Sequence, residues 1–233
     1  MATIAANIQQ VHDRMARACA LAQRPVQSVT LLTVSKTYSA DAVREAVAAG
    51  ERRFGENYVQ EGVDKISELI DLRDRLEWHL IGPLQSNKTR VVASQFDWVH
   101  TVDRLKIAER LSAQRPPGLA PLQVCLQVNT SGEANKSGLG PAELAPVARA
   151  VAALPGLRLR GLMAIPEPTA DPIEQRRAHR ALRDLFDRLR ADGLDLDTLS
   201  MGMTADLEAA ILEGATIVRV GTAIFGARIQ PGR

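Results

Sequence analysis

The feature that most constrains the fold of this chain is a regular alternation of short apolar segments with longer amphipathic ones. The strand-like segments run over 29–36, 52–57, 77–82, 98–103, 122–130, 157–165, 198–203 and 217–225. The helix-like segments between them end near 50, 75, 95, 114, 154, 192 and 214. Because parallel strands need a crossover connection, which is usually a helix, the alternation predicts parallel strands covered by helices.

One more helix is predicted ahead of the first strand. Apolar residues recur at helical spacing before Pro25, at Ile4, Ile8, Val11, Met15 and Ala18. An arginine-bearing amphipathic N-terminus is also typical of a transit peptide, but Asp13 argues against that alternative because transit peptides are poor in acidic residues. We therefore expect an amphipathic helix that packs on the body of the protein.

Eight parallel strands can close into a barrel or lie open as a doubly wound sheet, and two observations favour the barrel. The strands are short and evenly spaced, and no G-x-G-x-x-G pattern follows the first of them. The length of 233 residues is compatible with a (β/α)8 barrel, for which about 250 is typical. Since no Pro/Gly/Ser-rich linker interrupts the pattern, we expect an α/β fold with one TIM-type barrel domain over 1–233.

Composition excludes several classes of function. The formal net charge is only +2 and no long run of like charges appears, so we expect no nucleic-acid surface. No apolar run reaches the roughly 18 residues of a membrane helix, and no secretory signal precedes the first helix, so we expect a cytoplasmic protein without a membrane partner. Cys19 and Cys125 are too few for a disulfide framework or a zinc site. No heptad seam is visible, and we expect a monomer.

In a barrel of this kind the chemistry lies at the carboxyl-terminal ends of the strands, so the residues there are the candidates. The first strand ends in Lys36. Burial of an ammonium group is costly and lowers its pKa, which produces a neutral amine that can attack a carbonyl carbon. The alternative is a lysine whose ammonium reaches solvent at the rim. Asn57, His79 and Met163 end other strands, although a lone histidine on an apolar strand is more often a core residue with satisfied hydrogen bonds.

The last two strands predict a phosphate site. The segment 200–204 reads SMGMT and the segment 219–222 reads RVGT. Barrels commonly bind phosphate in the loops after strands seven and eight, and Ser200, Gly221 and Thr222 would supply hydroxyl groups and close backbone approach there. The alternative is that the glycines are ordinary turn residues. One ligand could contact both the lysine at the end of the first strand and the phosphate site after the last two strands. An aldehyde that carries a phosphate has a group for each.

Longer segments resemble a known family. They are TVSKT, RRFGENYVQE, EWHLIGPLQSNK, VNTSGEANKSG, LRGLMAIPE and SMGMTADLEAAILEGATIVRVGTAIFGAR. Over roughly 5–228 the chain resembles the pyridoxal-phosphate homeostasis protein family, which is similar to the barrel domain of alanine racemase standing alone. Thr204 stands where many members have serine, a change that keeps a hydroxyl group for the helix N-cap.

The resemblance implies a fold-type III site with pyridoxal 5'-phosphate as the cofactor. It implies an internal aldimine on Lys36, phosphate contacts from Ser200, Gly221 and Thr222, and Arg219 facing the pyridine nitrogen. It also implies that Asn57, His79, Met163, Met201 and Met203 lie near the cofactor. The family's role is binding and supplying pyridoxal phosphate, with apo forms of pyridoxal phosphate enzymes as recipients. The sequence leaves the role of Lys136 open.

Whether the chain is an enzyme depends on Arg219 and on a second acid/base group. A nearby carboxylate generally protonates the ring nitrogen of pyridoxal phosphate, whereas an arginine is a fixed donor that leaves this nitrogen unprotonated. Racemisation also needs a group on each face of the amino acid, and no second domain is expected to supply one. We therefore favour a carrier over a racemase of low activity, with Tyr38 left as a candidate second base. A third possibility is a barrel that binds another phosphate ester without covalent chemistry.

Overall fold

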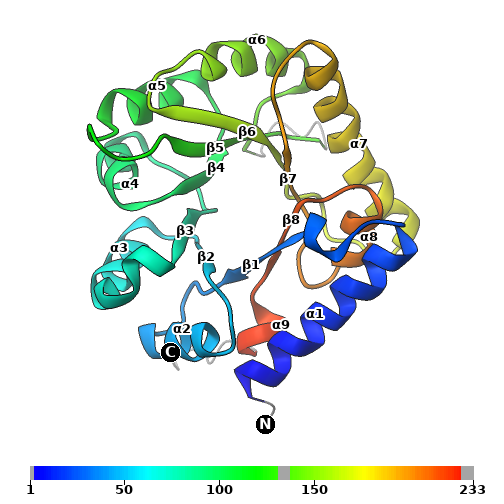
Figure 1. Ribbon diagram of the computed structural model, residues 1–233. Helices are drawn as coiled ribbons and strands as arrows, with labels where there is room; N and C mark the ends of the chain where they lie inside the picture. Colours follow the sequence, from blue (N-terminus) through cyan, green and yellow to red (C-terminus); the bar gives the residue numbers. More distant parts are fainter. Residues whose placement is uncertain (1–2, 131–136, 227–233) are drawn as a thin grey trace, which may run out of the picture.

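The computed structural model describes residues 3–130 and 137–226 and shows a closed barrel of parallel strands in the order β1 to β8. Figure 1 shows the strands in the middle and the helices in a ring around them. The strands are β1 (Thr30–Val34), β2 (Arg53–Glu56), β3 (Glu77–Leu80), β4 (Trp98–Val102), β5 (Leu122–Gln127), β6 (Leu157–Met163), β7 (Thr198–Ser200) and β8 (Ile217–Val220). The prediction of a barrel is confirmed, since β1 pairs with both β2 and β8.

Helices follow the strands as the alternation predicts. They are α2 (Ala40–Ala48), α3 (Val59–Glu68), α4 (Thr89–Gln95), α5 (Leu105–Gln114), α6 (Pro141–Ala152), α7 (Pro172–Ala191), α8 (Leu207–Leu212) and α9 (Thr222–Phe225). Short 3-10 helices η1 (Val26–Ser28), η2 (Ile70–Arg75) and η3 (Ser86–Lys88) occupy parts of the connections. Among the described residues, no helix is both long and apolar enough to cross a membrane.

The expected N-terminal helix is α1 (Ile4–Leu21), which packs across the outside of the barrel beside α8 and α9 (Figure 1). Its buried face includes Ile8, Val11 and Met15. The Asn7 side-chain amide donates to the carbonyl oxygen of Ile224 at 2.8 Å. The helix therefore covers the end of the chain that closes the barrel.

The core has two layers because successive side chains of a strand point to opposite faces. The larger layer lies between the sheet and the helices. The smaller one fills the barrel interior and consists of Leu32, Val34, Ile81, Trp98, Cys125, Met163 and Ile217. Side chains therefore fill the barrel, and the room for a ligand lies at its ends.

Several predicted strands extend too far at their carboxyl ends. The eighth strand stops at Val220, so Gly221 and Thr222 lie beyond it, and the apolar residues after them form α9. The change occurs at Gly221, whose φ of −122° and ψ of −68° leave the extended region. The fifth strand likewise stops at Gln127, because the next residue, Val128, forms only an isolated bridge.

Candidate functional site

Lys36 lies just past β1, at the carboxyl-terminal end of the barrel. Leu32 and Val34 of β1 belong to the interior layer, and Lys36 follows Val34 by two residues, in the turn after the strand. Its side chain is half-buried. The next residue, Thr37, has a φ of 68°, which β-branched residues rarely adopt, and its N–H donates to Glu61. Strained backbone of this kind is concentrated at functional sites.

A buried charged cluster holds the backbone beside Lys36. The Lys65 ammonium on α3 donates to the carbonyl oxygen of Ser35 at 2.6 Å and to Oε1 of Glu56 and of Glu61, each at 2.7 Å. The Ser35 hydroxyl also donates to Glu56 Oε1 at 2.6 Å. Glu56 is fully buried, and burial raises the pKa of its carboxyl although Lys65 acts in the opposite direction. The cluster fixes the position of the segment that carries Lys36.

A hollow of about 370 Å³ opens at the same end of the barrel, between the ends of β2 to β6. Asn57 lines it, and the Oδ1 atom of Asn57 is buried without a hydrogen-bond partner among the described residues. Gly82 is required next to it, because a Cβ atom there would lie 1.9 Å from the Asn57 carbonyl oxygen. An unsatisfied buried acceptor is costly, so Asn57 is suited to accept a hydrogen bond from a ligand.

The ends of β7 and β8 lie side by side, and the turns that follow them bring Thr222 next to Thr204. The hydroxyl of Thr222 lies 3.2 Å from the hydroxyl of Thr204, and Thr222 is exposed. No hydrogen bond between described residues uses the backbone N–H of Thr204 or of Thr222. Gly202 has a φ of 91°, and a Cβ there would come within 2.5 Å of the Ala210 Cβ. This end of the barrel therefore offers hydroxyl groups and N–H donors on a tightly packed turn.

Arg219 projects from β8 beneath these groups and is 4% exposed. Its guanidinium donates to the carbonyl oxygen of Ser200 at 2.6 Å, to the Ser200 hydroxyl at 2.9 Å and to the carbonyl oxygen of Ala164 at 3.0 Å. Burial lowers the pKa of Arg219 to about 10, so the side chain remains a cation at neutral pH. It is a fixed donor and cation at the site.

His79 lies inside the barrel instead of at the rim where the sequence suggested it. Its Nδ1 lies 2.9 Å from His100 Nε2, and its Nε2 lies 2.8 Å from Glu77 Oε1. His100 Nδ1 lies 2.8 Å from Ser200 Oγ. His79, His100 and Ser200 have no exposed surface. His100 was not among the predicted site residues, although a histidine on the strand next to that of His79 was a usable signal.

The remaining predicted residues lie in different parts of the protein. Met163 lies in the barrel interior. Met201 packs in the layer between sheet and helices, and Met203 is half-buried with its N–H donating to Asp206 Oδ1 at 2.7 Å. Lys136 lies outside the described residues. Neither methionine of the turn after β7 contributes a polar side-chain contact, so a cofactor contact from them would be apolar or through the backbone.

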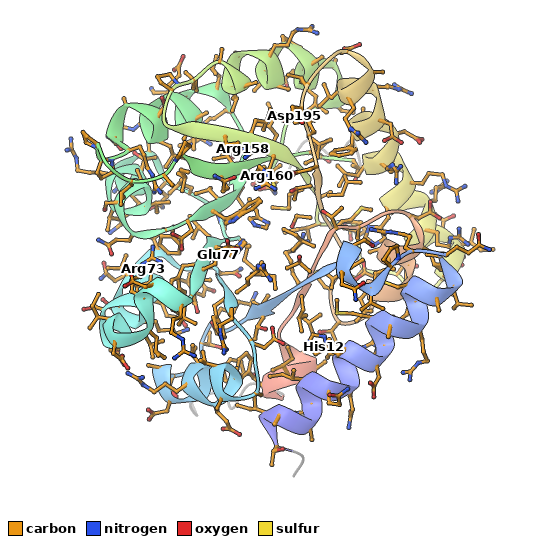
Figure 2. The ribbon with its side chains drawn as sticks, in the orientation of Figure 1. His12, Arg73, Glu77, Arg158, Arg160 and Asp195 are labelled. Atoms are coloured by element: carbon orange, nitrogen blue, oxygen red, sulfur yellow. The ribbon has the colours of Figure 1, made fainter. Side chains whose placement is uncertain are left out.

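A larger hollow of about 770 Å³ lies at the opposite, amino-terminal end of the barrel. Its charged lining residues are Arg52, Arg53, Arg73, Asp74, Arg75, Glu77, Asp97, Arg115 and Arg160. Figure 2 shows Glu77 on β3 and Arg160 on β6 inside the ring of helices at this end. Barrel chemistry is built at the other end, so we assign the site to the end that carries Lys36.

Comparison with known proteins identifies the family of the chain. Residues 2–229 match the family model "Alanine racemase, N-terminal domain". The chain is 62% identical to the pyridoxal phosphate homeostasis protein of Pseudomonas aeruginosa, with 98% of this chain and 97% of the relative covered. It is 55% identical to the protein of that name from Escherichia coli, with 98% of each covered. The chain belongs to the pyridoxal phosphate homeostasis protein family.

Solved structures agree with this family on the fold. PipY of Synechococcus elongatus, solved with pyridoxal phosphate bound, is similar with a TM-score of 0.80 and 40% identity over 91% of this chain and 100% of that one. Alanine racemase from Corynebacterium glutamicum is similar with a TM-score of 0.65 and 18% identity over 95% of this chain and 63% of that one. At that identity the racemase supports the barrel fold alone.

Proposed function

We propose that this protein binds pyridoxal 5'-phosphate and holds it as a Schiff base on Lys36. The observation that carries the proposal is the position of Lys36 in the turn directly after β1, at the end of the barrel where the polar groups gather. Lys65 is buried with all three of its hydrogen bonds made. Lys88 and Lys106 lie in helical segments of the outer layer. The Lys36 amine would add to the aldehyde carbon, and water would leave.

The residues present fit the polar groups of such a cofactor. Asn57 Oδ1 has no partner among the described residues, and we infer that a polar group of the cofactor donates a hydrogen bond to it. The hydroxyls of Thr204 and Thr222, with their backbone N–H groups, suit a phosphate, as does the closely packed Gly221, where a Cβ would lie 3.0 Å from the Val34 carbonyl oxygen. We infer that Ser200 also binds the phosphate and that His79 acts on the cofactor only through other side chains.

The site favours a carrier over a racemase. Bound pyridoxal phosphate supplies an aldehyde for the lysine and, when its ring nitrogen is protonated, an electron sink. Arg219 is a donor without acceptor atoms, so it keeps a facing ring nitrogen unprotonated. The Tyr38 hydroxyl donates to the carbonyl oxygen of Gly226 at 2.7 Å, and its ring stacks on Phe225 at 4.7 Å. These contacts occupy the hydroxyl and the ring of Tyr38, which argues against Tyr38 as the second base.

We further propose that the protein acts as a monomer in the cytoplasm and supplies the cofactor to apo forms of pyridoxal phosphate enzymes. Both cysteines, Cys19 and Cys125, are free and buried, which suits a reducing compartment. The exposed Thr222 and the half-buried Lys36 make the bound aldehyde reachable by water or by an acceptor. Supply requires this reversibility, because the lysine must be released by hydrolysis.

Transfer to an acceptor tests the supply role. Protein loaded with pyridoxal phosphate and dialysed is mixed with the apo form of a pyridoxal phosphate enzyme, and the recovery of its activity is followed. We expect transfer from the parent protein, and far less from Lys36→Ala because that variant retains little cofactor through dialysis. Full retention by the parent with no transfer would contradict the supply role.

Exchange of the Cα proton tests the racemase alternative. The loaded protein is incubated with alanine and a panel of other amino acids in heavy water, and deuterium incorporation is measured. We expect no exchange above that of free pyridoxal phosphate. Exchange that depends on both Lys36 and Tyr38 would show that the site is a racemase.

A further inference from the structure

A continuous chain of hydrogen bonds crosses the barrel interior from one end to the other. It runs from Glu77 through His79 and His100 to Ser200, with contacts of 2.8, 2.9 and 2.8 Å, and Arg219 adds a contact of 2.9 Å at the far end. The Glu77 side chain is 40% exposed and lines the amino-terminal hollow, whereas the two imidazoles and Ser200 are fully buried. This Glu77–His79–His100–Ser200 relay joins an exposed carboxylate to the proposed phosphate end.

The order of the hydrogens along the relay follows from the state of Glu77. An ionised carboxylate only accepts, so His79 must carry its proton on Nε2 and accept on Nδ1. His100 must then donate from Nε2 and accept on Nδ1, because burial lowers the pKa of both imidazoles and keeps them neutral. The Ser200 hydroxyl therefore gives its hydrogen to His100 and accepts from Arg219. In this order Ser200 has no hydrogen left for a phosphate.

A phosphate that accepts a hydrogen bond from Ser200 requires the opposite order. Ser200 Oγ must then accept from His100 Nδ1, His100 Nε2 must accept from His79 Nδ1, and His79 Nε2 must accept from Glu77. Each imidazole gives a proton from Nε2 and receives one at Nδ1. Ser200 passes one proton to His100 and receives one from solvent, and Glu77 keeps the last. The balance is one proton gained by the protein.

We propose that Glu77, His79 and His100 are positioning residues that couple phosphate binding at Ser200 to proton uptake at Glu77, at the opposite end of the barrel. The proposal rests on the proposed function, since the phosphate is that of pyridoxal phosphate. The relay thus makes cofactor affinity fall as the pH rises, because the loaded state holds the additional proton.

The groups that surround the relay keep Glu77 ionised in the empty protein. Glu77 faces Arg53 on β2 at 3.3 Å, Trp98 on β4 and Arg160 on β6, besides His79 on its own strand. Asp97 faces His79, and Arg219 faces His100. Burial opposes ionisation of Glu77, but these partners outweigh it and lower the pKa of the carboxyl.

The tautomers of the two histidines test the proposal directly. The full chain is labelled with 15N-histidine, and its nitrogen chemical shifts are recorded empty and after saturation with pyridoxal phosphate. The chain has 4 histidines, so His12→Gln and His179→Gln suffice to identify the two barrel signals. We expect both barrel imidazoles to carry the proton on Nε2 in the empty protein and on Nδ1 in the loaded one. Unchanged tautomers in protein with pyridoxal phosphate on Lys36 would overturn the relay and leave the proposed function intact.

Binding measured against pH gives a second, independent test. The amide of Glu77→Gln can accept or donate a hydrogen bond without taking up a proton, so this variant allows both orders of the hydrogens along the relay. As the pH rises, the affinity of the parent for pyridoxal phosphate should fall more steeply than that of Glu77→Gln. Above the pKa of Glu77, the ratio of the two affinities should change by up to about tenfold per pH unit. Glu51→Gln is the matched control, because Glu51 bonds His12 at 2.8 Å at the same end of the barrel without a connection to Ser200.

Each outcome of the pH experiment decides the question. A Glu51→Gln profile like that of the parent, together with a flatter Glu77→Gln profile, supports the relay. Parallel profiles for the parent and Glu77→Gln overturn it. If pyridoxal phosphate does not bind at Lys36 at all, the proposed function fails and the relay proposal fails with it.

Discussion

Replacement of Lys65 by methionine should strongly destabilise the protein while leaving its fold class unchanged. The substitution removes three hydrogen bonds from one buried ammonium group, including the contact with the Ser35 carbonyl beside Lys36. It leaves the Glu56 carboxyl fully buried, and Glu56 Oε2 already has no partner among the described residues. Breaking a buried ion pair by removing one partner costs about 3–5 kcal/mol, because the remaining charge is uncompensated.

Urea denaturation measures this loss. With a slope of about 2 kcal/mol per M, a loss of 3–5 kcal/mol lowers the urea midpoint by roughly 1.5–2.5 M. Because burial raises the pKa of Glu56, its carboxyl takes up a proton more readily as the pH falls, and a neutral carboxyl needs no cation. The difference between parent and Lys65→Met should therefore shrink in mildly acidic buffer. Lys106→Met on the surface of α5 is the control, with an expected change within about 0.5 kcal/mol.

The double variant Glu56→Gln/Lys65→Met isolates the cause. Removing the buried charge together with its partner should recover part of the free energy of unfolding lost in Lys65→Met, with a coupling of about 0.5–3 kcal/mol. Two results would contradict a stabilising role for the Lys65–Glu56 pair. One is a Lys65→Met variant as stable as Lys106→Met, and the other is a double variant no more stable than Lys65→Met alone.

Three further predictions follow from the geometry. Gly82→Ala should weaken cofactor retention and stability, since its Cβ would lie 1.9 Å from the Asn57 carbonyl oxygen; wild-type retention after dialysis would contradict this. The hydrogen bond with Glu51 raises the pKa of His12 above 6.5, so its stabilising effect is complete below that pH and is lost as the pH rises through the raised value. The difference in urea midpoint between the parent and His12→Gln should shrink accordingly from about pH 6 to about pH 9. Burial raises the pKa of Cys125 to about 12, so a thiol reagent should label it only after denaturation.

The sequence was sufficient to predict the barrel because strand-like segments alternate regularly with amphipathic helical segments, and some of the helices have capping residues. Ser39 caps α2, and its hydroxyl accepts the Ala42 N–H as expected of an N-cap. The ends of the strands were harder to predict. Ile224 and Phe225 continue the apolar run of β8 but form α9, where Asn7 of α1 contacts the Ile224 carbonyl oxygen. Contacts with a distant helix decide that boundary, and local pattern does not contain them.

Part of the candidate site could be predicted from the sequence, and part could not. Lys36 and the turns after β7 and β8 are visible in the sequence because they are polar or glycine positions at the ends of apolar runs. The relay is not visible, since it depends on the register that places His79 beside Trp98 on the next strand and on a contact between His100 and Ser200 across the barrel. The Lys65 cluster is hidden for a similar reason, because a lysine on an amphipathic helix is expected to face solvent.

The visible absorption spectrum, recorded before and after borohydride, tests whether Lys36 holds pyridoxal phosphate covalently. The parent protein and Lys36→Ala are each saturated with pyridoxal phosphate, dialysed and reduced, and the labelled peptide is then identified by mass spectrometry. We expect a yellow parent whose colour is lost on reduction with the mass of the cofactor fixed on Lys36, and a colourless Lys36→Ala. A parent that stays colourless, or a label fixed on Lys88 or Lys106 instead, would contradict this expectation.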